Sequence, residues 1–195
     1  MSYCVHELFS VPLIHLQFNQ HHKYTNLPII RKKDKRPANW TMSVNTSYPN
    51  IVKDDEFISL HTANELKLDI SNAITTAFKD INISTNFNIF SFWYNIYHEH
   101  QGQEPHNHIG NVNPYWCGTY YNKNATPTIF YKEQGIRDIH IMPDWDESKL
   151  RLSFTPVSKI DMNEGDILLF PPYLTHSVPE QEQYRVTFSF NLIRK

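Results

Sequence analysis

The stretch from residue 165 to residue 191 constrains the fold of this chain most strongly. Gly165-Asp166 is a turn signal, and the four apolar residues after it predict a short buried strand. Pro171-Pro172 ends that strand, because proline has no N–H to donate to a neighbouring strand. His176 follows this corner, where the backbone can fix the position of a side chain. The stretch therefore predicts a β-rich fold that presents a histidine beside a tight corner.

The strand that closes this stretch, residues 185–191, alternates between polar and apolar side chains. One face carries Arg185, Thr187, Ser189 and Asn191, and the other carries Val186, Phe188 and Phe190. A polar edge strand that faces water is one interpretation of this pattern. The other is a cavity lined by an arginine and two hydroxyls, which suits a bound anion. The short distance along the chain to His176 favours the cavity.

Composition favours a single β-rich domain. The chain has 195 residues, which is enough for one domain with a sizeable core. Aromatic residues reach 14%, and 12 prolines accompany 5 glycines, which suits strands joined by stiff corners better than a helical bundle. The formal net charge of −2 gives no basic footprint for nucleic acid, so we do not expect a nucleic-acid substrate.

Cysteine usage and hydropathy predict the compartment. The chain has 2 cysteines, Cys4 and Cys117, which are too few for a disulfide framework and fit a reducing compartment. The sequence shows no charged start followed by an apolar stretch, and no apolar run of membrane-spanning length. We therefore expect a cytoplasmic protein without a membrane partner.

One helix and several strands can be placed from periodicity. After an opening strand at residues 8–18, residues 62–65 fit a capping box, and apolar positions then recur at helical spacing. From Asn86 onward, short extended runs predict strands, the fourth of them at residues 150–154. The charged segment 132–149 is expected to be a loop, either a lid or a substrate surface. This order predicts a β-sandwich or barrel with helical packing on one side.

Histidines gather in one short segment. Four of the 11 histidines are His98, His100, His106 and His108. In an extended segment, residues i and i+2 point the same way, so either pair could present two imidazoles to one metal ion. His176 is the natural third ligand from a distant strand. Such a site leaves positions open for substrate and oxygen. Both pairs remain candidates on spacing alone.

The chain resembles the iron(II)- and 2-oxoglutarate-dependent oxygenases, in particular a microbial or phage-borne branch related to the prolyl hydroxylases. The resembling pieces cover about the C-terminal half in the family's order, and they are Trp93-Tyr94-Asn95, Pro105-His106-Asn107-His108, Cys117-Gly118-Thr119-Tyr120-Tyr121 and the stretch 165–191. The resemblance implies a mainly β (α+β) fold, the double-stranded β-helix or jelly roll, with one or more helices packed on one side. Within a single domain spanning residues 1–195, residues 1–85 would supply an N-terminal strand and helical support. Residues 86–195 would form the jelly-roll core with the metal site, and a phage-borne protein would lie in the host cytoplasm.

The resemblance implies iron ligands at named positions. His106 matches the first iron ligand of the family, and His176 matches the distal histidine. The family at large has Asp or Glu at the position of His108, but this branch often shows His-x-His there. The implied metal site is therefore His106, His108 and His176. A carboxylate arriving from Glu99 or Glu104 is the alternative.

The pair His98/His100 is the less favoured one, because the strand expected at residues 115–121 follows His106/His108 at the family's usual distance. An all-histidine site has neutral ligands, so bound iron would keep its full charge of 2+. Free imidazoles take up a proton at about pH 6.5, and a protonated imidazole cannot bind a metal ion. We therefore expect iron affinity to fall steeply below about pH 6.

The resemblance also implies a site for 2-oxoglutarate. Arg185, nine residues after His176, matches the basic residue that pairs with the distal carboxylate of 2-oxoglutarate. Thr187 matches the hydroxyl of the same element, and Tyr120 matches a tyrosine that often shares this carboxylate. A buried dianion needs a permanent cation and further donors, and arginine cannot lose its proton. No catalytic residue is expected beyond the metal ligands, and the remaining pocket residues are expected to be Trp93, Asn95 and Tyr97.

The implied activity is that of a dioxygenase that uses iron(II), 2-oxoglutarate and O2 to hydroxylate an unactivated C–H bond. The substrate is a protein or a small molecule, and a peptidyl, prolyl-like side chain is the family-level expectation. The alternatives are a cupin-type metalloprotein that does not use 2-oxoglutarate and a non-catalytic jelly-roll binding protein. Residues 165–176 fit a cupin motif, but a cupin would not explain the presence of Arg185 on the polar face of the last strand. The oligomeric state stays open, with a homodimer among the candidates.

Overall fold

Two antiparallel sheets organise the structure. The computed structural model describes residues 3–8, 11–27, 37–48, 58–110, 114–133 and 154–195. The large sheet has the strand order β1-β2-β9-β6-β11-β4-β3, and the small sheet has the order β5-β10-β7-β8. The strands are β1 (Tyr3–Leu8), β2 (Val11–Gln17), β3 (Asn45–Thr46), β4 (Phe87–Tyr97), β5 (Gln103–His106), β6 (Trp116–Lys123), β7 (Ile129–Glu133), β8 (Phe154–Lys159), β9 (Asp166–Phe170), β10 (His176–Val178) and β11 (Arg185–Arg194). The mainly β, jelly-roll fold expected from the sequence is confirmed.

Strand β11 lies inside the large sheet, between β4 and β6, and carries the alternation seen in the sequence. Its apolar side chains belong to the core formed with helix α1 (Leu60–Asp80), and they are Val186, Phe188, Phe190 and Leu192. Its polar side chains line a cavity on the opposite face, and they are Arg185, Thr187, Ser189 and Asn191. Both faces are therefore covered. The cavity interpretation of the alternation is correct, and the interpretation as an edge strand is wrong.

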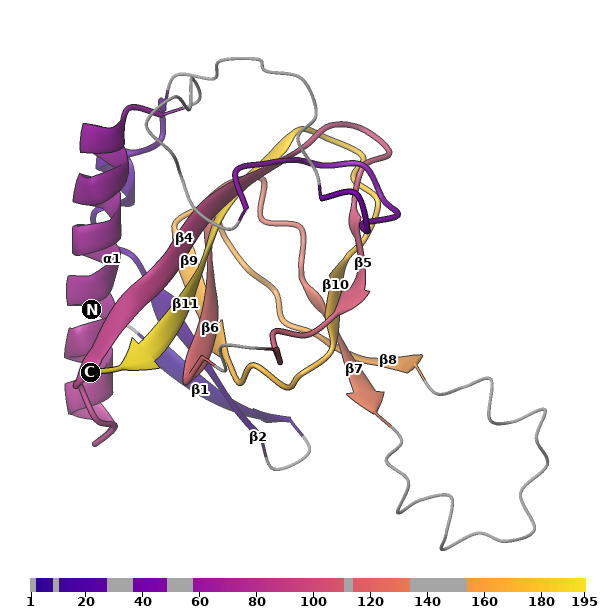
Figure 1. Ribbon diagram of the computed structural model, residues 1–195. Helices are drawn as coiled ribbons and strands as arrows, with labels where there is room; N and C mark the ends of the chain where they lie inside the picture. Colours follow the sequence, from indigo (N-terminus) through magenta and orange to yellow (C-terminus); the bar gives the residue numbers. More distant parts are fainter. Residues whose placement is uncertain (1–2, 9–10, 28–36, 49–57, 111–113, 134–153) are drawn as a thin grey trace, which may run out of the picture.

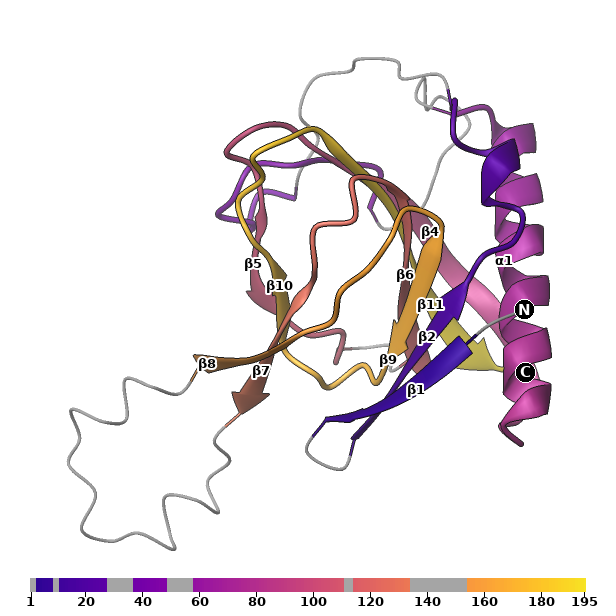
Figure 2. The same cartoon turned by 180° about the vertical axis from the view of Figure 1, so that it is seen from behind.

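Helix α1 covers the outer face of the large sheet, and the small sheet lies on the other side (Figure 1, Figure 2). The helix begins after Ser59, whose Oγ accepts a hydrogen bond from the N–H of Thr62 at 3.1 Å. The capping box expected at residues 62–65 therefore lies inside the helix, because Ser59 supplies the same capping chemistry three residues earlier. Seven buried side chains form its inner face, and they are Ala63, Leu66, Ile70, Ala73, Ile74, Ala77 and Phe78.

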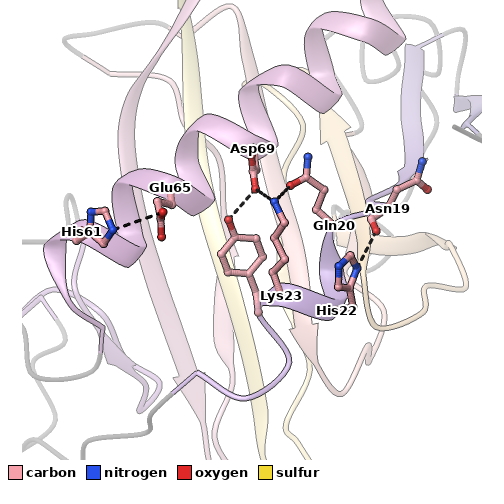
Figure 3. Close-up of polar contacts among 8 residues, drawn as sticks. Asn19, Gln20, His22, Lys23, His61, Glu65 and Asp69 are labelled. Atoms are coloured by element: carbon pink, nitrogen blue, oxygen red, sulfur yellow. Dashed lines mark hydrogen bonds and ion pairs between the residues drawn. The ribbon is translucent and has the colours of Figure 1, made fainter.

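A short 3-10 helix, η1 (His21–Lys23), is tied to α1 by polar side chains (Figure 3). The hydroxyl of Tyr24 donates a hydrogen bond to Oδ2 of Asp69 at 2.8 Å, and Nζ of Lys23 lies 3.2 Å from the same oxygen. Exposed ion pairs contribute about 0–1 kcal/mol, so the partly buried Tyr24–Asp69 hydrogen bond is the stronger tie. It holds the segment after β2 against the helix.

The space between the two sheets contains a packed core and a cavity. The packed part consists of Leu13, Cys117, Tyr121, Phe130, Ile160, Met162, Leu168, Phe170 and Leu174. Cys117 is a buried free thiol in this core. The cavity has a volume of about 590 Å³ and is lined by residues of β4, β5, β10 and β11 together with the segment 39–48. The fold thus leaves a hollow where the small sheet faces the polar side of β11.

Part of the sequence prediction falls outside the described residues. Of the loop expected at residues 132–149, only the first two residues are described, and they end β7. Of the strand expected at residues 150–154, only Phe154 is described, and β8 begins there. Among the helices that the structure describes, none is long and apolar enough to cross a membrane.

Candidate active site

Three histidines meet at the cavity. His106 ends β5 and His176 begins β10, and the two residues are paired across these antiparallel strands. His108 follows two residues after β5, and its backbone N–H donates to the carbonyl oxygen of Pro172 at 2.8 Å. The ring centroids of the three histidines lie 4.3, 5.2 and 5.5 Å apart. One nitrogen of each ring lies within 4.8 Å of the others, so the group could hold a metal ion.

In each of these histidines, Nδ1 donates a hydrogen bond to an oxygen atom. Nδ1 of His106 and Nδ1 of His176 each donate to the main-chain carbonyl oxygen two residues earlier, at 2.8 and 2.9 Å. Nδ1 of His108 donates to Oδ1 of Asn191 at 2.8 Å. Because Nδ1 carries the proton in all three rings, Nε2 keeps its lone pair. This is the tautomer that metal ligation through Nε2 requires.

Burial keeps all three imidazoles neutral. It lowers the pKa of His106 from 6.5, and it lowers the pKa of His108 to about 4. The pKa of His176 falls well below 6.5, first because of its burial and then because of the two neighbouring histidines. A proton therefore competes with a metal ion only at a lower pH than for free imidazole. The fall in iron affinity expected below about pH 6 therefore moves to a lower pH.

We expect the metal-free protein to lose stability as the pH falls from 6.5 toward 4. In the unfolded chain the imidazole of His108 takes up its proton at about pH 6.5. In the folded protein its pKa is about 4, so the ring stays neutral down to that pH. The unfolded state binds more protons in this window. The free energy of unfolding is therefore at its full value above pH 6.5 and falls below it, by about 2 kcal/mol for His108 alone between pH 7 and pH 5.

Urea unfolding of chelator-treated protein at pH 7 and pH 5 measures this loss. The variant His108→Gln should show a smaller loss than the wild type. His98→Gln is the matched control, because His98 lies outside the cluster, with its ring centroid 5.5 Å from that of Tyr184. An equal loss in all three proteins would mean that His108 does not contribute to the pH dependence.

Arg185 is a buried cation that has no counter-charge among the described residues. Its side chain is fully buried, and the guanidinium carbon lies 5.3 Å from the ring centroid of Tyr97 and 5.4 Å from that of Tyr121. Its Nε and Nη1 have no hydrogen-bond partner, and no carboxylate of the described residues forms an ion pair with it. Burial accordingly lowers the pKa of Arg185, although arginine keeps its proton. An unpaired buried charge is costly, so this site suits a bound anion.

The polar face of β11 joins Arg185 to the histidines. Thr187 and Ser189 line the cavity between Arg185 and Asn191 in the strand, as expected for Thr187. Asn95 on β4 also lines it, and its Nδ2 donates to Oγ of Ser189 at 3.1 Å. The floor of the cavity is therefore a hydrogen-bonded polar surface, and the structure brings Thr187 and Asn95 to the same cavity as Arg185.

Tyr120 does not lie in this cavity. Its ring belongs to the core under α1, and its hydroxyl lies 2.7 Å from Nδ1 of His21. The next residue, Tyr121, points to the other face of the sheet, toward Arg185. Successive residues of a strand alternate between faces, so a shift of one residue exchanges the two environments. The prediction for Tyr120 is therefore wrong, and Tyr121 is the tyrosine that the structure places beside Arg185.

Aromatic side chains border the histidines. Trp93 lines the cavity as the sequence predicted, with its ring centroid 6.0 Å from that of His108. Trp40 stacks on His106 at 6.5 Å. Tyr48 lies between the two tryptophans, 5.5 Å from Trp40 and 5.1 Å from Trp93. We call Trp40, Tyr48 and Trp93 the aromatic collar. It gives the cavity an apolar wall next to the metal-binding group.

Glu104 anchors the segment that carries part of this collar. Its two carboxylate oxygens accept hydrogen bonds from the N–H groups of Thr41 at 2.9 Å and Met42 at 3.2 Å. Glu104 therefore serves the backbone of residues 41–42, and it does not join the histidine group. Trp40 and Tyr48 could not be predicted as site residues, because they reach the site through contacts between residues that are distant in sequence.

The competing pair, His98 and His100, lies apart from the site. Neither residue lines the cavity. His100 faces Glu99 at 3.7 Å, and both side chains are mostly exposed. Among the residues that the structure describes, the group that could hold a metal ion is His106, His108 and His176.

Comparison with known proteins identifies a family. Residues 91–191, more than half of the chain, match the family described as "Putative 2OG-Fe(II) oxygenase". A search of curated proteins gives no match.

Solved structures share the fold. An oxidoreductase of the 2OG-Fe(II) oxygenase family from Burkholderia pseudomallei is 11% identical, with a TM-score of 0.61 over 94% of this chain and 85% of that one. HygX from Streptomyces hygroscopicus, with nickel, 2-oxoglutarate and hygromycin B bound, is 12% identical, with a TM-score of 0.56 over 95% and 84%. A prolyl hydroxylase from Trichoplax adhaerens, in complex with a hypoxia inducible factor peptide, is 13% identical, with a TM-score of 0.55 over 98% and 83%.

The residues present fit the cofactors of this family. Three neutral imidazoles with free Nε2 atoms suit iron(II), which imidazole nitrogen binds well. A buried arginine that has no counter-charge among the described residues suits a carboxylate of 2-oxoglutarate. With the match over residues 91–191, these features lead to one conclusion: the chain belongs to the 2OG-Fe(II) oxygenases and is an oxygenase that uses iron(II), 2-oxoglutarate and O2.

Proposed function

We propose that His106, His108 and His176 bind the iron(II) and that Arg185, with Thr187, binds the distal carboxylate of 2-oxoglutarate. The observation that carries this proposal is the buried guanidinium of Arg185, which lies in the same cavity as the three histidines. Its Nε and Nη1 have no hydrogen-bond partner among the described residues. A dianion that reaches both groups offsets the buried charge of the arginine and the charge of the metal ion. The ligands themselves are neutral, so this balance depends on the cosubstrate.

The bound iron(II) and 2-oxoglutarate supply the activation of O2, which yields a hydroxylated substrate, succinate and carbon dioxide. The protein contributes position and environment. The Nδ1 hydrogen bonds fix the three imidazoles, and Arg185 holds the far end of the cosubstrate. The aromatic collar and the buried strands around it limit the access of water.

We infer a peptidyl substrate whose reacting residue carries a small apolar side chain, such as a prolyl ring. The aromatic collar supports this inference, because two of its side chains, Trp40 and Trp93, border two of the proposed iron ligands, and the collar offers no charged group. Flat aromatic walls pack well against aliphatic rings and contribute by burial of apolar area. The side chain of Tyr48 is 45% exposed, so the collar reaches the surface, where a peptide could approach.

Anaerobic titration of the iron(II)-loaded protein with 2-oxoglutarate tests the cofactor assignment. We expect a visible metal-to-ligand charge-transfer band that saturates at one equivalent of 2-oxoglutarate per iron. Air and a library of proline-containing peptides should then give succinate and a peptide mass increased by one oxygen atom. Iron binding without a band would favour the cupin-type alternative. If the band forms but no peptide is hydroxylated, the cofactor assignment stands and the peptidyl substrate is refuted.

A further inference from the structure

The three histidines differ in what orients them. His106 and His176 each donate from Nδ1 to a main-chain carbonyl oxygen two residues earlier in their own strand or corner. His108 donates instead to a side chain, Oδ1 of Asn191, at 2.8 Å. A main-chain acceptor is present whatever residue occupies its position, whereas a side-chain acceptor depends on one residue type. His108 is therefore the member of the group whose geometry depends on the identity of another residue.

The position of Asn191 suits this contact. Asn191 lies on β11 in the large sheet, where it is paired with Cys117 of β6 and Ser91 of β4. The pairing of β11 with β4 shifts its register directly after Asn191. Such irregularities bend a strand and redirect side chains. His108 comes from the other side of the cavity, on the segment after β5. The hydrogen bond between them joins the large sheet to the histidine group.

We propose that Asn191 is a positioning residue for the metal centre, which fixes the ring orientation and the Nδ1–H tautomer of His108 so that Nε2 can bind the metal. This proposal rests on the metal site proposed above. Without an acceptor at Nδ1, the neutral ring is free to rotate, and part of the population carries its proton on Nε2, where it blocks ligation. Loss of such an outer partner costs about 10–100-fold in metal affinity.

Cobalt(II) affinity provides the first test, because it needs neither 2-oxoglutarate nor turnover. We expect Asn191→Leu, which keeps the approximate volume and removes the acceptor, to weaken cobalt(II) binding by about 10–100-fold. Asn191→Asp keeps an acceptor oxygen and should restore binding to at least the wild-type level. Arg194→Met is the control on the same strand, because Arg194 is exposed, does not line the cavity and lies over the ring of Tyr115. Its affinity should stay unchanged.

Proton NMR of the cobalt(II)-loaded proteins tests the tautomer directly. A histidine bound through Nε2 shows its Nδ1–H as an exchangeable signal shifted far downfield by the metal. We expect three such signals in the wild type and in Asn191→Asp. In Asn191→Leu the signal of His108 should be lost to exchange with water. Three persistent signals, together with wild-type cobalt(II) affinity, would overturn the proposal.

A double-mutant cycle separates positioning from general folding effects. In a His108→Asp background, the ligand at 108 has no Nδ1 proton to orient, so Asn191→Leu should cost little further cobalt(II) affinity. An equal loss in both backgrounds would show that Asn191 acts on the fold rather than through His108. Thermal unfolding of the metal-free proteins checks folding, and Asn191→Ala replaces Asn191→Leu if the latter does not fold. Absence of cobalt(II) binding in the wild type would refute the metal site itself, which is a different outcome.

Discussion

Replacing Arg185 with methionine should raise the concentration of 2-oxoglutarate needed for half-saturation of the iron(II) protein by about 100-fold or more. Removing one partner of a buried, hydrogen-bonded charge pair costs about 2–5 kcal/mol, and each 1.4 kcal/mol is tenfold in affinity. Methionine keeps an unbranched side chain between the rings of Tyr97 and Tyr121, so the packing changes little. The variant therefore removes only the positive charge and the N–H donors of the guanidinium.

The stability of the ligand-free variant gives an independent signature. Arg185 has no counter-charge among the described residues, so its burial costs free energy in the absence of an anion. We expect Arg185→Met to keep or raise the melting temperature of the ligand-free protein while it loses 2-oxoglutarate. A purely structural arginine would show the opposite pattern. The control is Arg194→Met, on the same strand, because Arg194 is exposed and lies over the ring of Tyr115 at 4.4 Å.

The charge-transfer band of the anaerobic iron(II) protein measures the affinity for 2-oxoglutarate in both variants. Arg194→Met should match the wild type. An unchanged half-saturation concentration in Arg185→Met would place the carboxylate of the cosubstrate elsewhere in the cavity. A melting temperature that falls in Arg185→Met alone would show that the guanidinium stabilises the protein by contacts within the fold.

The parts of the site that the sequence predicted are those fixed by local rules. Alternation along β11 put Arg185 and Thr187 on one face, because a strand has a period of two whatever surrounds it. The corner at Pro171-Pro172 leads into His176, and the carbonyl oxygen of Pro172 also accepts a hydrogen bond from the backbone N–H of His108. These features depend on a few neighbouring residues, so the sequence contains them.

The errors lie where local rules leave a choice. Tyr120 and Tyr121 are adjacent and chemically identical, and only the pairing of β6 with β11 decides which one faces Arg185. The register pairs Tyr121 with Thr187 and Tyr120 with Phe188, so the polar and apolar faces of the two strands coincide. Alignment of the alternating pattern of both strands would have identified Tyr121. The start of α1 is a similar case, since Ser59 and Thr62 both suit an N-cap.

Sequence reasoning could not find Trp40 and Tyr48 of the aromatic collar, or the contact made by Asn191, for another reason. Trp40 contacts His106 across a large gap in the sequence, through a segment that Glu104 holds by its backbone. Nothing in the composition of residues 37–48 points to a cavity. The alternation along β11 puts Asn191 on the polar face of the strand. It does not predict which group across the cavity accepts or donates a hydrogen bond to Asn191. Contacts of this kind become visible only when the two sheets are assembled.

Replacing His176 with alanine should weaken metal binding by more than about 1,000-fold, the largest effect expected for a single histidine. Loss of an outer partner already costs about 10–100-fold, and a direct ligand contributes more. His176 is the most buried of the three, at 6% exposure, and it contacts both His106 and His108. No other histidine or carboxylate of the described residues lies in the group to take its place.

The control for His176→Ala is His98→Ala, which tests the competing pair of histidines at the same time. His98 and His100 lie outside the cavity, so His98→Ala should bind cobalt(II) and iron(II) as the wild type does. If His98→Ala lost the metal and His176→Ala kept it, the metal would belong to the His98/His100 pair, and the arrangement around Arg185 would need another explanation. If both kept it, metal binding would not depend on the cavity at all. The expected result is that His176→Ala alone loses the metal. This result would link the metal to the corner after β9, the part of the sequence that constrains the fold most strongly.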